Sequence, residues 1–197
     1  MTTASPLVNP TACMPPSPAQ PPPSLLAGAV VRAVPPRTLR HASPLGPVLL
    51  AATADGLCGL WFEGQKHWPH ASSAWAEGAG DDTLLREAAR QLDAYFADRL
   101  HTFSLPLDLS AGTPFQAQVW RALRGIARGS TLTYAQLAER IGRVGAARAV
   151  GAAVGRNPLS VVVPCHRVLG QAGALTGYAG GLDRKRALLR LEGAAGA

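Results

Sequence analysis

The chain has 197 residues, of which 47% are hydrophobic, and a formal net charge of +7. This length suits one ordinary domain or two small ones, and the apolar content is sufficient for a hydrophobic core. The three cysteines, Cys13, Cys58 and Cys165, are odd in number and far apart, which argues against a disulfide framework or paired zinc ligands and favours a reducing compartment.

The N-terminal segment has no feature of a membrane anchor or a secretory signal. Residues 1–24 contain no lysine or arginine, and the apolar run over 25–31 is seven residues long. A transmembrane helix needs about 18 or more apolar residues, and a signal peptide begins with a basic region. We therefore expect an intracellular, cytoplasmic protein with no membrane partner.

Proline dominates the same segment. Ten of the 17 prolines lie in residues 1–36. Proline fixes φ and removes backbone donors, and this segment offers little apolar surface to bury. The composition predicts a disordered tail over 1–36, with folded structure beginning near Arg37.

Two apolar runs follow, over 47–53 and 57–63, and both are typical of strands. Asp55-Gly56 between them suits a tight hairpin turn. Cys58 lies in the second run, where a core role is favoured over a reactive one.

A helix is predicted after this hairpin, with Asp82 as the candidate N-cap. Its apolar residues recur at helical spacing: Leu85, Ala88, Leu92 and Phe96. Residues 37–110 therefore predict a small α/β domain.

Residues 111–197 predict a second, mainly helical domain. Thr113 followed by Pro114 is typical of a helix start. Four apolar residues then mark one buried face: Phe115, Val119, Leu123 and Ile126. Thr133 and Gln136 have the spacing of a capping box, which predicts the start of a second helix.

Gly142 is placed to end that helix, and a third helix is predicted over 146–155. Two short helices joined by a tight turn predict a helix-turn-helix. The third helix offers small residues almost throughout: Ala146, Ala147, Ala149, Gly151, Ala152 and Ala153. Arg148 is its one long polar side chain, so the helix favours binding by shape and phosphate contact, with Arg148 as a wedge in the base stack. A small-residue packing face inside the protein is an equally open alternative.

Positive charge is concentrated in the second domain. Residues 111–197 hold 12 lysines and arginines against 3 acidic residues, whereas residues 1–110 hold 7 against 9. This asymmetry indicates a polyanion partner for the second domain, although a merely soluble basic surface is the alternative. The predicted last helix carries a basic cluster of Arg184, Lys185, Arg186 and Arg190, for which a solvated face is favoured over phosphate contact.

The segment VVVPCHRVLG, residues 161–170, places Cys165 in an apolar stretch beside a base. Pro164 restricts the backbone before Cys165, and in a plain strand Cys165 and His166 would point to opposite faces. A turn or a bridging water would let His166 accept the thiol proton and generate the nucleophilic thiolate at neutral pH. The histidine needs an orienting carboxylate, and this half offers three: Glu139, Asp183 and Glu192. A nucleophilic Cys165 is favoured over a core thiol.

Several co-linear blocks accompany the PCHRV motif. Asn157-Pro158 precedes it and GALTGYAGG follows it, while GTPFQAQVW, TYAQLAERIG and AARAVGAAVGRNP stand earlier in the chain. Together these blocks resemble the O6-alkylguanine-DNA alkyltransferase family, also called methylated-DNA-protein-cysteine methyltransferase. The resemblance is close over 111–193 and loose over 37–110.

The resemblance implies a ribonuclease H-like N-terminal α/β domain, with a small antiparallel sheet and a helix, followed by a winged helix-turn-helix-like C-terminal domain. It also implies DNA repair. An alkylated guanine, with O4-alkylthymine as a further candidate, would be flipped out of the duplex and would lose its alkyl group to Cys165. Because a thioether has no ready leaving group, each molecule would act once.

Roles for individual residues follow from the same resemblance. His166 would be the water-linked base for Cys165, Glu192 would orient it, and Asn157 would brace the surrounding turn. Tyr134 would give a proton to the departing guanine. DNA contacts would come from Arg148, which fills the space left by the base, and from Tyr134, Ala147 and Arg156. The substrate pocket would be formed by Val168, Tyr178, Ala179 and Lys185.

The implied partner is double-stranded DNA, bound through the minor groove with little sequence preference by a monomer associated with the nucleoid. No cofactor is implied, and the zinc ligands of some relatives have no counterpart here. Two other classes remain as alternatives: a winged-helix DNA-binding regulator without chemistry, and a cysteine hydrolase. Zinc held by Cys165 and His166 would leave a tetrahedral site half empty.

Overall fold

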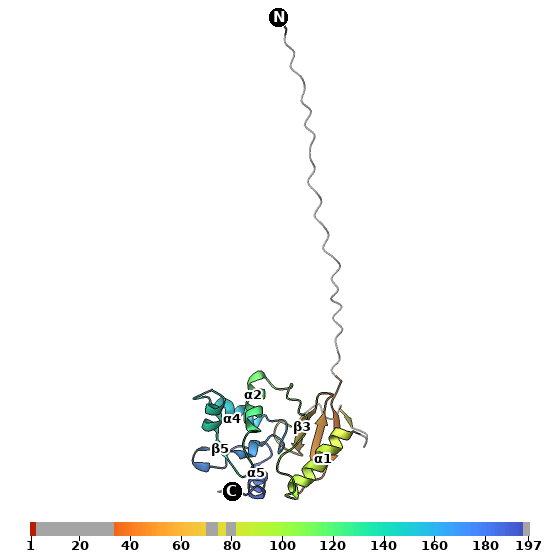
Figure 1. Cartoon of the computed structure of the whole chain (residues 1–197), viewed down its shortest axis with the longest axis vertical. Coiled ribbons are helices and arrows are strands. Elements are labelled where there is room, and N and C mark those ends of the chain that lie inside the picture. Colours follow the sequence, from red (N-terminus) through yellow and green to blue (C-terminus); the bar gives the residue numbers. More distant parts are fainter. Residues whose placement is uncertain (3–33, 70–74, 78–81, 195–197) are drawn as a thin grey trace. The chain divides into compact units, whose positions relative to one another are not determined.

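The computed structural model describes residues 1–2, 34–69, 75–77 and 82–194 (Figure 1). Val34–Ala197 forms one compact unit. Cys13 and nearly all of the segment 1–36 lie outside the described residues, so the disorder expected there stays a prediction. Among the described residues, no helix is both long enough and apolar enough to cross a membrane.

The first half of the unit is built on an antiparallel sheet. Strands β1 (Arg37–His41), β2 (Val48–Ala52) and β3 (Leu57–Phe62) are ordered β3-β2-β1, and the short β4 (Ala76–Glu77) pairs in parallel with β1. The predicted hairpin between β2 and β3 is confirmed. Its continuous apolar sequence reflects burial on both faces of the sheet, because all five residues of β2 are buried.

Strands β1 and β4 have no strand signal in the sequence. The five residues of β1, RTLRH, include only one apolar side chain, Leu39. β1 forms its hydrogen-bonded ladder with the apolar β2 from Arg37 to His41. The neighbouring strand therefore explains the conformation of β1 better than its own residues do.

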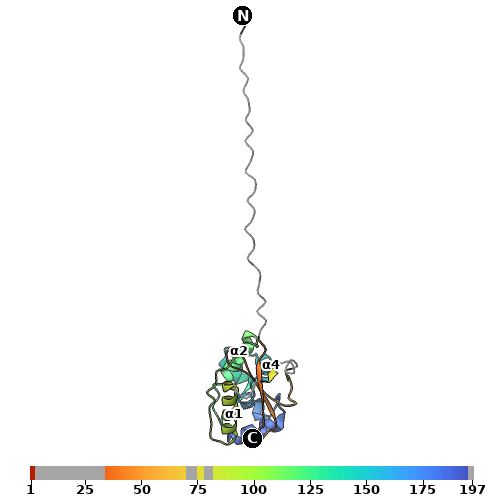
Figure 2. The ribbon, with the colours of Figure 1, turned by 90° about the vertical axis from the view of Figure 1, so that its right-hand side faces the viewer.

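Helix α1 (Thr83–Phe96) lies along the sheet in both ribbon views (Figures 1 and 2). It begins as predicted, because the Asp82 carboxylate accepts hydrogen bonds from the backbone of Leu84 and Leu85. Arg37 of β1 also pairs with Asp82. The opposite face of the sheet holds a separate small cluster around Trp61, into which Cys58 packs, in agreement with the core role expected for this cysteine.

The described residues of the second half form four α-helices: α2 (Pro114–Leu123), α3 (Tyr134–Arg140), α4 (Ala147–Gly155) and α5 (Leu182–Leu191). Both predicted capping patterns are present, at Thr113 with Gln116 and at Thr133 with Gln136. Gly142 follows α3 with a positive φ of 71°, as its predicted role requires. Strands β5 (Leu132–Thr133) and β6 (Val168–Leu169) pair in parallel beside these helices.

The two halves share one hydrophobic core, and β3 links them directly. The backbone N–H of Leu60 donates to Pro158 O at 2.8 Å, and the N–H of Ser160 donates to Leu60 O at 2.9 Å. The segment that leads to Cys165 is therefore held by the edge of the N-terminal sheet.

Candidate active site

Cys165 begins a single 3-10 turn, Cys165–Arg167, directly after Pro164. The turn replaces the plain strand in which neighbouring side chains would face opposite ways. Cys165 is only 5% exposed and His166 is fully buried. Among the described residues the Cys165 thiol has no direct hydrogen bond to His166, which favours the water-linked arrangement over direct bonding.

Asn157 holds the thiol from the other side. Its side-chain Nδ2 lies 3.1 Å from Cys165 Sγ and donates to Val163 O at 2.9 Å, while its Oδ1 accepts from the N–H of Leu159 at 3.0 Å. One buried amide thus fixes the chain on both sides of Pro164 and supplies the sulfur with a hydrogen-bond donor.

Of the three carboxylates expected as partners for His166, Glu192 is the one in contact. His166 Nε2 lies 3.1 Å from Glu192 Oε1, and both side chains are fully buried. Asp183 instead pairs with Arg186, and Glu139 is exposed. Because Nε2 faces the carboxylate, it carries the proton, which leaves Nδ1 as the basic nitrogen. Nδ1 is buried and has no hydrogen-bond partner among the described residues.

Two residues that the sequence reasoning did not assign complete the surroundings of Glu192. Arg167 donates from Nε to Oε2 at 2.8 Å and from Nη2 to Oε1 at 2.7 Å, and the Tyr95 hydroxyl donates to Oε1 at 2.7 Å. Arg167 could have been suspected, since it is a charged residue inside an apolar segment. Tyr95 could not, because its position on α1 is that of an ordinary core residue.

Burial sets the protonation of the reactive pair. Burial raises the pKa of the Cys165 thiol, against the lowering effects of the Asn157 hydrogen bond and the Lys185 charge. Burial lowers the pKa of His166, although Glu192 acts in the opposite direction. The resting state is therefore a thiol beside a neutral imidazole that can accept its proton.

The pKa of Glu192 is set more by its hydrogen-bond partners than by its burial. Burial alone would raise the pKa of Glu192, but the hydrogen bonds from His166 and Arg167 hold the pKa well below its ordinary value. The carboxylate stays ionised in the folded protein. Among the residues described, no group of three or more His, Cys, Asp or Glu side chains is placed to hold a metal ion.

Lys185 corrects the expectation of a solvated basic face on α5. Its side chain is fully buried, and Nζ donates to Val168 O at 2.6 Å and to Thr176 O at 2.8 Å. Burial lowers the pKa of Lys185 to about 8. Lys185 thus ties together the two ends of the glycine-containing loop after β6, whereas Arg190 on the same helix is exposed.

A small pocket of about 150 Å³ opens beside this loop. Of the four residues that the family resemblance implies for a substrate pocket, Tyr178 and Ala179 line it, together with Tyr134, whereas Val168 and Lys185 are buried and do not. The wall from the N-terminal half, formed by Lys66 and His67, was not expected. The backbone N–H of Lys66 donates to Ala179 O at 2.9 Å, which explains why this turn reaches the pocket.

A wider groove of about 640 Å³ adjoins the pocket and shares Tyr134 and Gly151 with it. Ala147 and Arg148 of α4 line the groove. The hydroxyl of Tyr134 lies 3.4 Å from Thr176 O, and burial raises the pKa of this phenol, so Tyr134 keeps its proton.

Helix α4 presents its small residues outward. Ala149, Ala152 and the side chain of Arg148 are exposed, as is Arg156 just after the helix. The buried positions are Val150, Ala153 and Val154. Of the six small residues named for this helix, Ala153 is buried, Ala149 and Ala152 are exposed, and Ala146, Ala147 and Gly151 are half-buried, so an internal packing face accounts for only part of the helix. The outer face of α4 allows close approach of a large partner.

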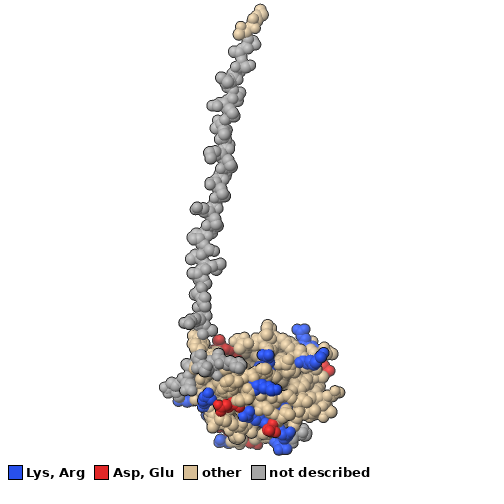
Figure 3. Space-filling view, turned by 180° about the vertical axis from the view of Figure 1, so that it is seen from behind, with Lys and Arg blue, Asp and Glu red and all other residues tan. Residues whose placement is uncertain are grey.

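Basic side chains are distributed over the surface. In the face drawn in Figure 3, lysine and arginine stand at several separate places, with acidic side chains at a few places between them.

Comparison with known proteins accounts for both halves of the fold. A family model described as the DNA binding domain of 6-O-methylguanine DNA methyltransferase matches residues 114–194. A second model, described as the ribonuclease-like domain of the same protein, matches residues 40–109.

The methylated-DNA-protein-cysteine methyltransferase of Methanosarcina acetivorans is 48% identical over 151 residues, which cover 77% of this chain and 94% of the relative. That of Mycobacterium leprae is 48% identical over 150 residues, covering 76% and 88%. The crystal structure of Mycobacterium tuberculosis OGT in complex with DNA matches with a TM-score of 0.71 at 47% identity, covering 81% of this chain and 93% of that one. Since these matches extend through both halves of the fold, the chain belongs to the methylated-DNA-protein-cysteine methyltransferase family.

Proposed function

We propose that Cys165 is the alkyl acceptor of this DNA repair protein. As a member of its family, the chain repairs O6-alkylguanine in DNA by transferring the alkyl group to one of its own cysteines. The observation that carries the assignment is the buried thiol of Cys165, which accepts a hydrogen bond from Asn157 and is adjacent to the His166–Glu192 pair. The other described cysteine, Cys58, packs in the tryptophan cluster of the sheet.

The chemistry is a displacement at the alkyl carbon. The thiol proton passes to His166 Nδ1, through a water molecule, and Sγ forms a bond to the alkyl carbon as the bond from that carbon to guanine O6 breaks. Tyr134 gives its proton to the departing guanine, and His166 restores that proton through solvent. One thiol and one alkylguanine are consumed, and one thioether and one guanine are formed. Without a leaving group on the thioether, the protein acts once.

The electrostatics of the site support this order of events. His166 is neutral and can accept a proton, and the ionised Glu192 stabilises the imidazolium that forms. Asn157 donates to the sulfur as it becomes negative. Glu192 and Asn157 thus act as positioning and charge-stabilising partners of the reacting thiol.

DNA binding is assigned to the groove beside α4. Arg148 fills the space left by the flipped base, while Tyr134, Ala147 and Arg156 contact the nucleotide backbone. Val168, Tyr178, Ala179 and Lys185 form or support the base pocket. The shortage of base-reading side chains on α4 supports minor-groove binding with little sequence preference, by one protein molecule per lesion.

Residues 37–110 act as a scaffold domain and residues 111–197 as the DNA-binding and acceptor domain, a division supported by the bounds of the two matched models. A DNA substrate also supports a location in the cytoplasm, at the nucleoid. A regulator without chemistry is not favoured, because the acceptor cysteine and its partners are all present.

The test is intact-mass spectrometry after incubation with an oligonucleotide that carries O6-methylguanine. We expect one added methyl group, on the peptide that contains Cys165, with one guanine restored per protein molecule. The matched variant is Cys165→Ser, with Cys58→Ser as the control that retains the reaction. Restoration of the guanine by Cys165→Ser, or an adduct elsewhere in the wild type, would overturn the assignment.

A further inference from the structure

Tyr95 connects the N-terminal half of the fold to the His166–Glu192 pair. It lies on α1 and is 1% exposed, and its hydroxyl donates to Glu192 Oε1 at 2.7 Å. The two residues are 97 positions apart in the chain. The hydrogen bond is therefore a tertiary contact, and its donor comes from the N-terminal half, which does not contain Cys165.

The oxygen that Tyr95 contacts is the one that faces His166. Glu192 Oε1 receives the Tyr95 hydroxyl and Arg167 Nη2, both at 2.7 Å, and lies 3.1 Å from His166 Nε2. The carboxylate can keep this orientation only while its donors stay in place. Each donor also withdraws negative charge from the oxygen that has to stabilise the imidazolium.

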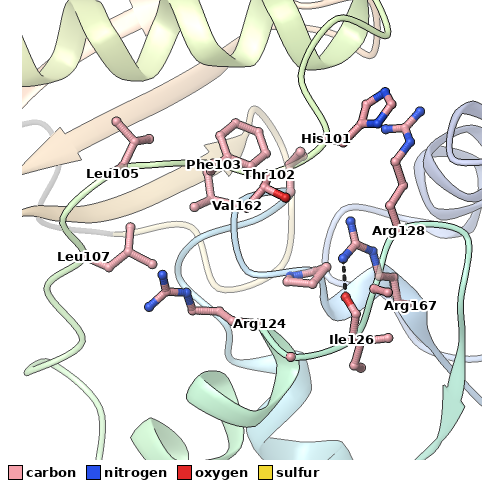
Figure 4. Close-up of a pocket in the computed structure, with 14 residues that line it drawn as sticks. His101, Thr102, Phe103, Leu105, Leu107, Arg124, Ile126, Arg128, Val162 and Arg167 are labelled. Carbon is pink, nitrogen blue, oxygen red and sulfur yellow. Dashed lines mark hydrogen bonds between the residues drawn. The ribbon is translucent and has the colours of Figure 1, made fainter.

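Of the two residues beside His166 that donate to Glu192, Arg167 lines a solvent-accessible cavity and Tyr95 does not. A cavity of about 360 Å³ lies behind the site, and Figure 4 shows Arg167 at its edge, donating to Ile126 O. Phe103 and Arg128 line the same cavity. The fully buried hydroxyl of Tyr95 is thus the donor to Glu192 that water can replace least readily.

The Tyr95 ring is held independently of its hydroxyl. Its centroid lies 5.4 Å from the ring of Phe96, edge on, and 5.4 Å from the ring of Phe103. The Arg128 guanidinium stands 5.6 Å from the same centroid. A phenylalanine at this position would keep these contacts and lose only the hydrogen bond.

We propose that Tyr95 is a positioning residue for alkyl transfer, which orients Glu192 and through it His166, so that the N-terminal half sets the reactivity of Cys165. This inference rests on the proposed function of Cys165. It extends the catalytic assembly from the PCHR turn and α5 to α1.

The first test is Tyr95→Phe, measured as the single-turnover rate of methyl transfer at saturating protein, over a range of pH. Without this hydrogen bond Glu192 and the imidazole that it orients are held less firmly in line with the Cys165 thiol, so transfer should slow about tenfold or more at neutral pH. With one donor fewer, Glu192 stabilises the imidazolium more strongly, so the pKa of His166 rises and the acid-side fall in rate moves to higher pH. DNA affinity should stay within about twofold, because Tyr95 lies away from the groove.

The matched control is Thr53→Val. Thr53 also lies in the N-terminal half and donates a 2.7 Å hydrogen bond from a hydroxyl to a carboxylate, but that carboxylate is Asp108. Its loss should lower the melting temperature without moving the rate or its pH profile. If Thr53→Val and Tyr95→Phe slow transfer equally, Tyr95 acts only through stability and the proposal is wrong.

A second variant keeps the proposal testable even if the protein does not fold with phenylalanine at position 95. Replacement of Tyr95 by 3-fluorotyrosine retains the hydroxyl and makes it a stronger donor, so the acid-side fall in rate should move to lower pH, opposite to Tyr95→Phe. An unmoved profile in this folded variant would overturn the proposal. Failure of the wild type to methylate Cys165 would instead overturn the proposed function, which separates the two outcomes.

Discussion

Cys165 and His166 are both buried, and burial shifts their pKa values in opposite senses, upward for the thiol and downward for the imidazole. Both groups are thus neutral before substrate arrives. A thiol without charge reacts slowly with oxidants and stray electrophiles. In the proposed single-turnover reaction, protection of the unreacted thiol has a direct functional value. In that reaction, charge separates only when the alkyl carbon and the developing guanine anion are in place.

The neutral, buried His166 makes stability depend on pH. Its pKa in the folded protein lies below the ordinary value of 6.5, so the unfolded chain takes up a proton first as the pH falls. The contribution of His166 to the free energy of unfolding should be constant near pH 7 and above, then fall below about pH 6.5 by up to about 1.4 kcal/mol per pH unit. The contribution of Glu192, whose pKa is also lowered, is lost only at more acidic pH, below its ordinary value of 4.5.

Urea denaturation at several pH values between 7 and 5 measures this effect. His166→Gln should flatten the dependence, since the titrating group is gone, whereas His101→Gln, at an exposed position, should retain the slope of the wild type. Equal slopes in the wild type and His166→Gln would show that another group is responsible.

At the scale of elements, α4 combines an inward face of Val150, Ala153 and Val154 with an outward face of alanines. The inward residues pack against α2 and α3, which fixes the helix rigidly. The outward residues add almost no bulk, so a DNA groove can approach the helix axis closely. In this arrangement Arg148 is the one long side chain that can reach beyond the helix surface into the base stack.

Arg148→Ala should therefore separate base extrusion from chemistry. Repair of O6-methylguanine in duplex DNA should slow at least about tenfold, because the vacated space in the stack is left unfilled and unstacking costs a few kcal/mol. The reaction with free O6-benzylguanine needs no extrusion and should be nearly unchanged. Arg190→Ala, an exposed arginine of α5, is the control. Equal slowing on both substrates would count against the wedge.

A helix or strand can be predicted from the sequence when the interactions that form it lie within a few residues of each other in the chain. Helix starts at Asp82, Thr113 and Thr133 are set by capping interactions within four residues, so the sequence alone located them. The polar β1 owes its conformation to pairing with β2, and no local pattern reveals it.

The same contrast applies to the site. Cys165 and His166 were found from adjacent residues and from their family resemblance. Residue types alone could not say which of Glu139, Asp183 and Glu192 pairs with His166. That pairing depends on how α5 packs against the PCHR turn. The burial of Lys185 within a basic run, and the reach of Tyr95 from α1, are tertiary facts of the same kind.

At the scale of the whole unit, the two halves behave as one structure. Leu60 of β3 exchanges backbone hydrogen bonds with the segment before Cys165, and Tyr95 of α1 reaches Glu192 beyond α5. Buried residues from both halves form one hydrophobic cluster. Neither half can unfold without exposing apolar surface of the other, so opening of the N-terminal half would also disorder the acceptor site.

This coupling predicts a single unfolding transition for residues 34–197. Trp61 reports on the N-terminal sheet, whereas Trp120 of α2 donates from its indole to Ala153 O at 2.8 Å and reports on the helical half. In Trp120→Phe, the remaining tryptophans belong to the N-terminal half, while circular dichroism at 222 nm follows mostly the helices, of which all but α1 lie in the second half of the described residues. The two signals should give the same melting midpoint, because the shared core and the Leu60 hydrogen bonds make the halves lose structure together. Two separated midpoints would mean that the sheet can melt while the helices persist, and the N-terminal half would then be a dispensable scaffold rather than part of the reactive assembly.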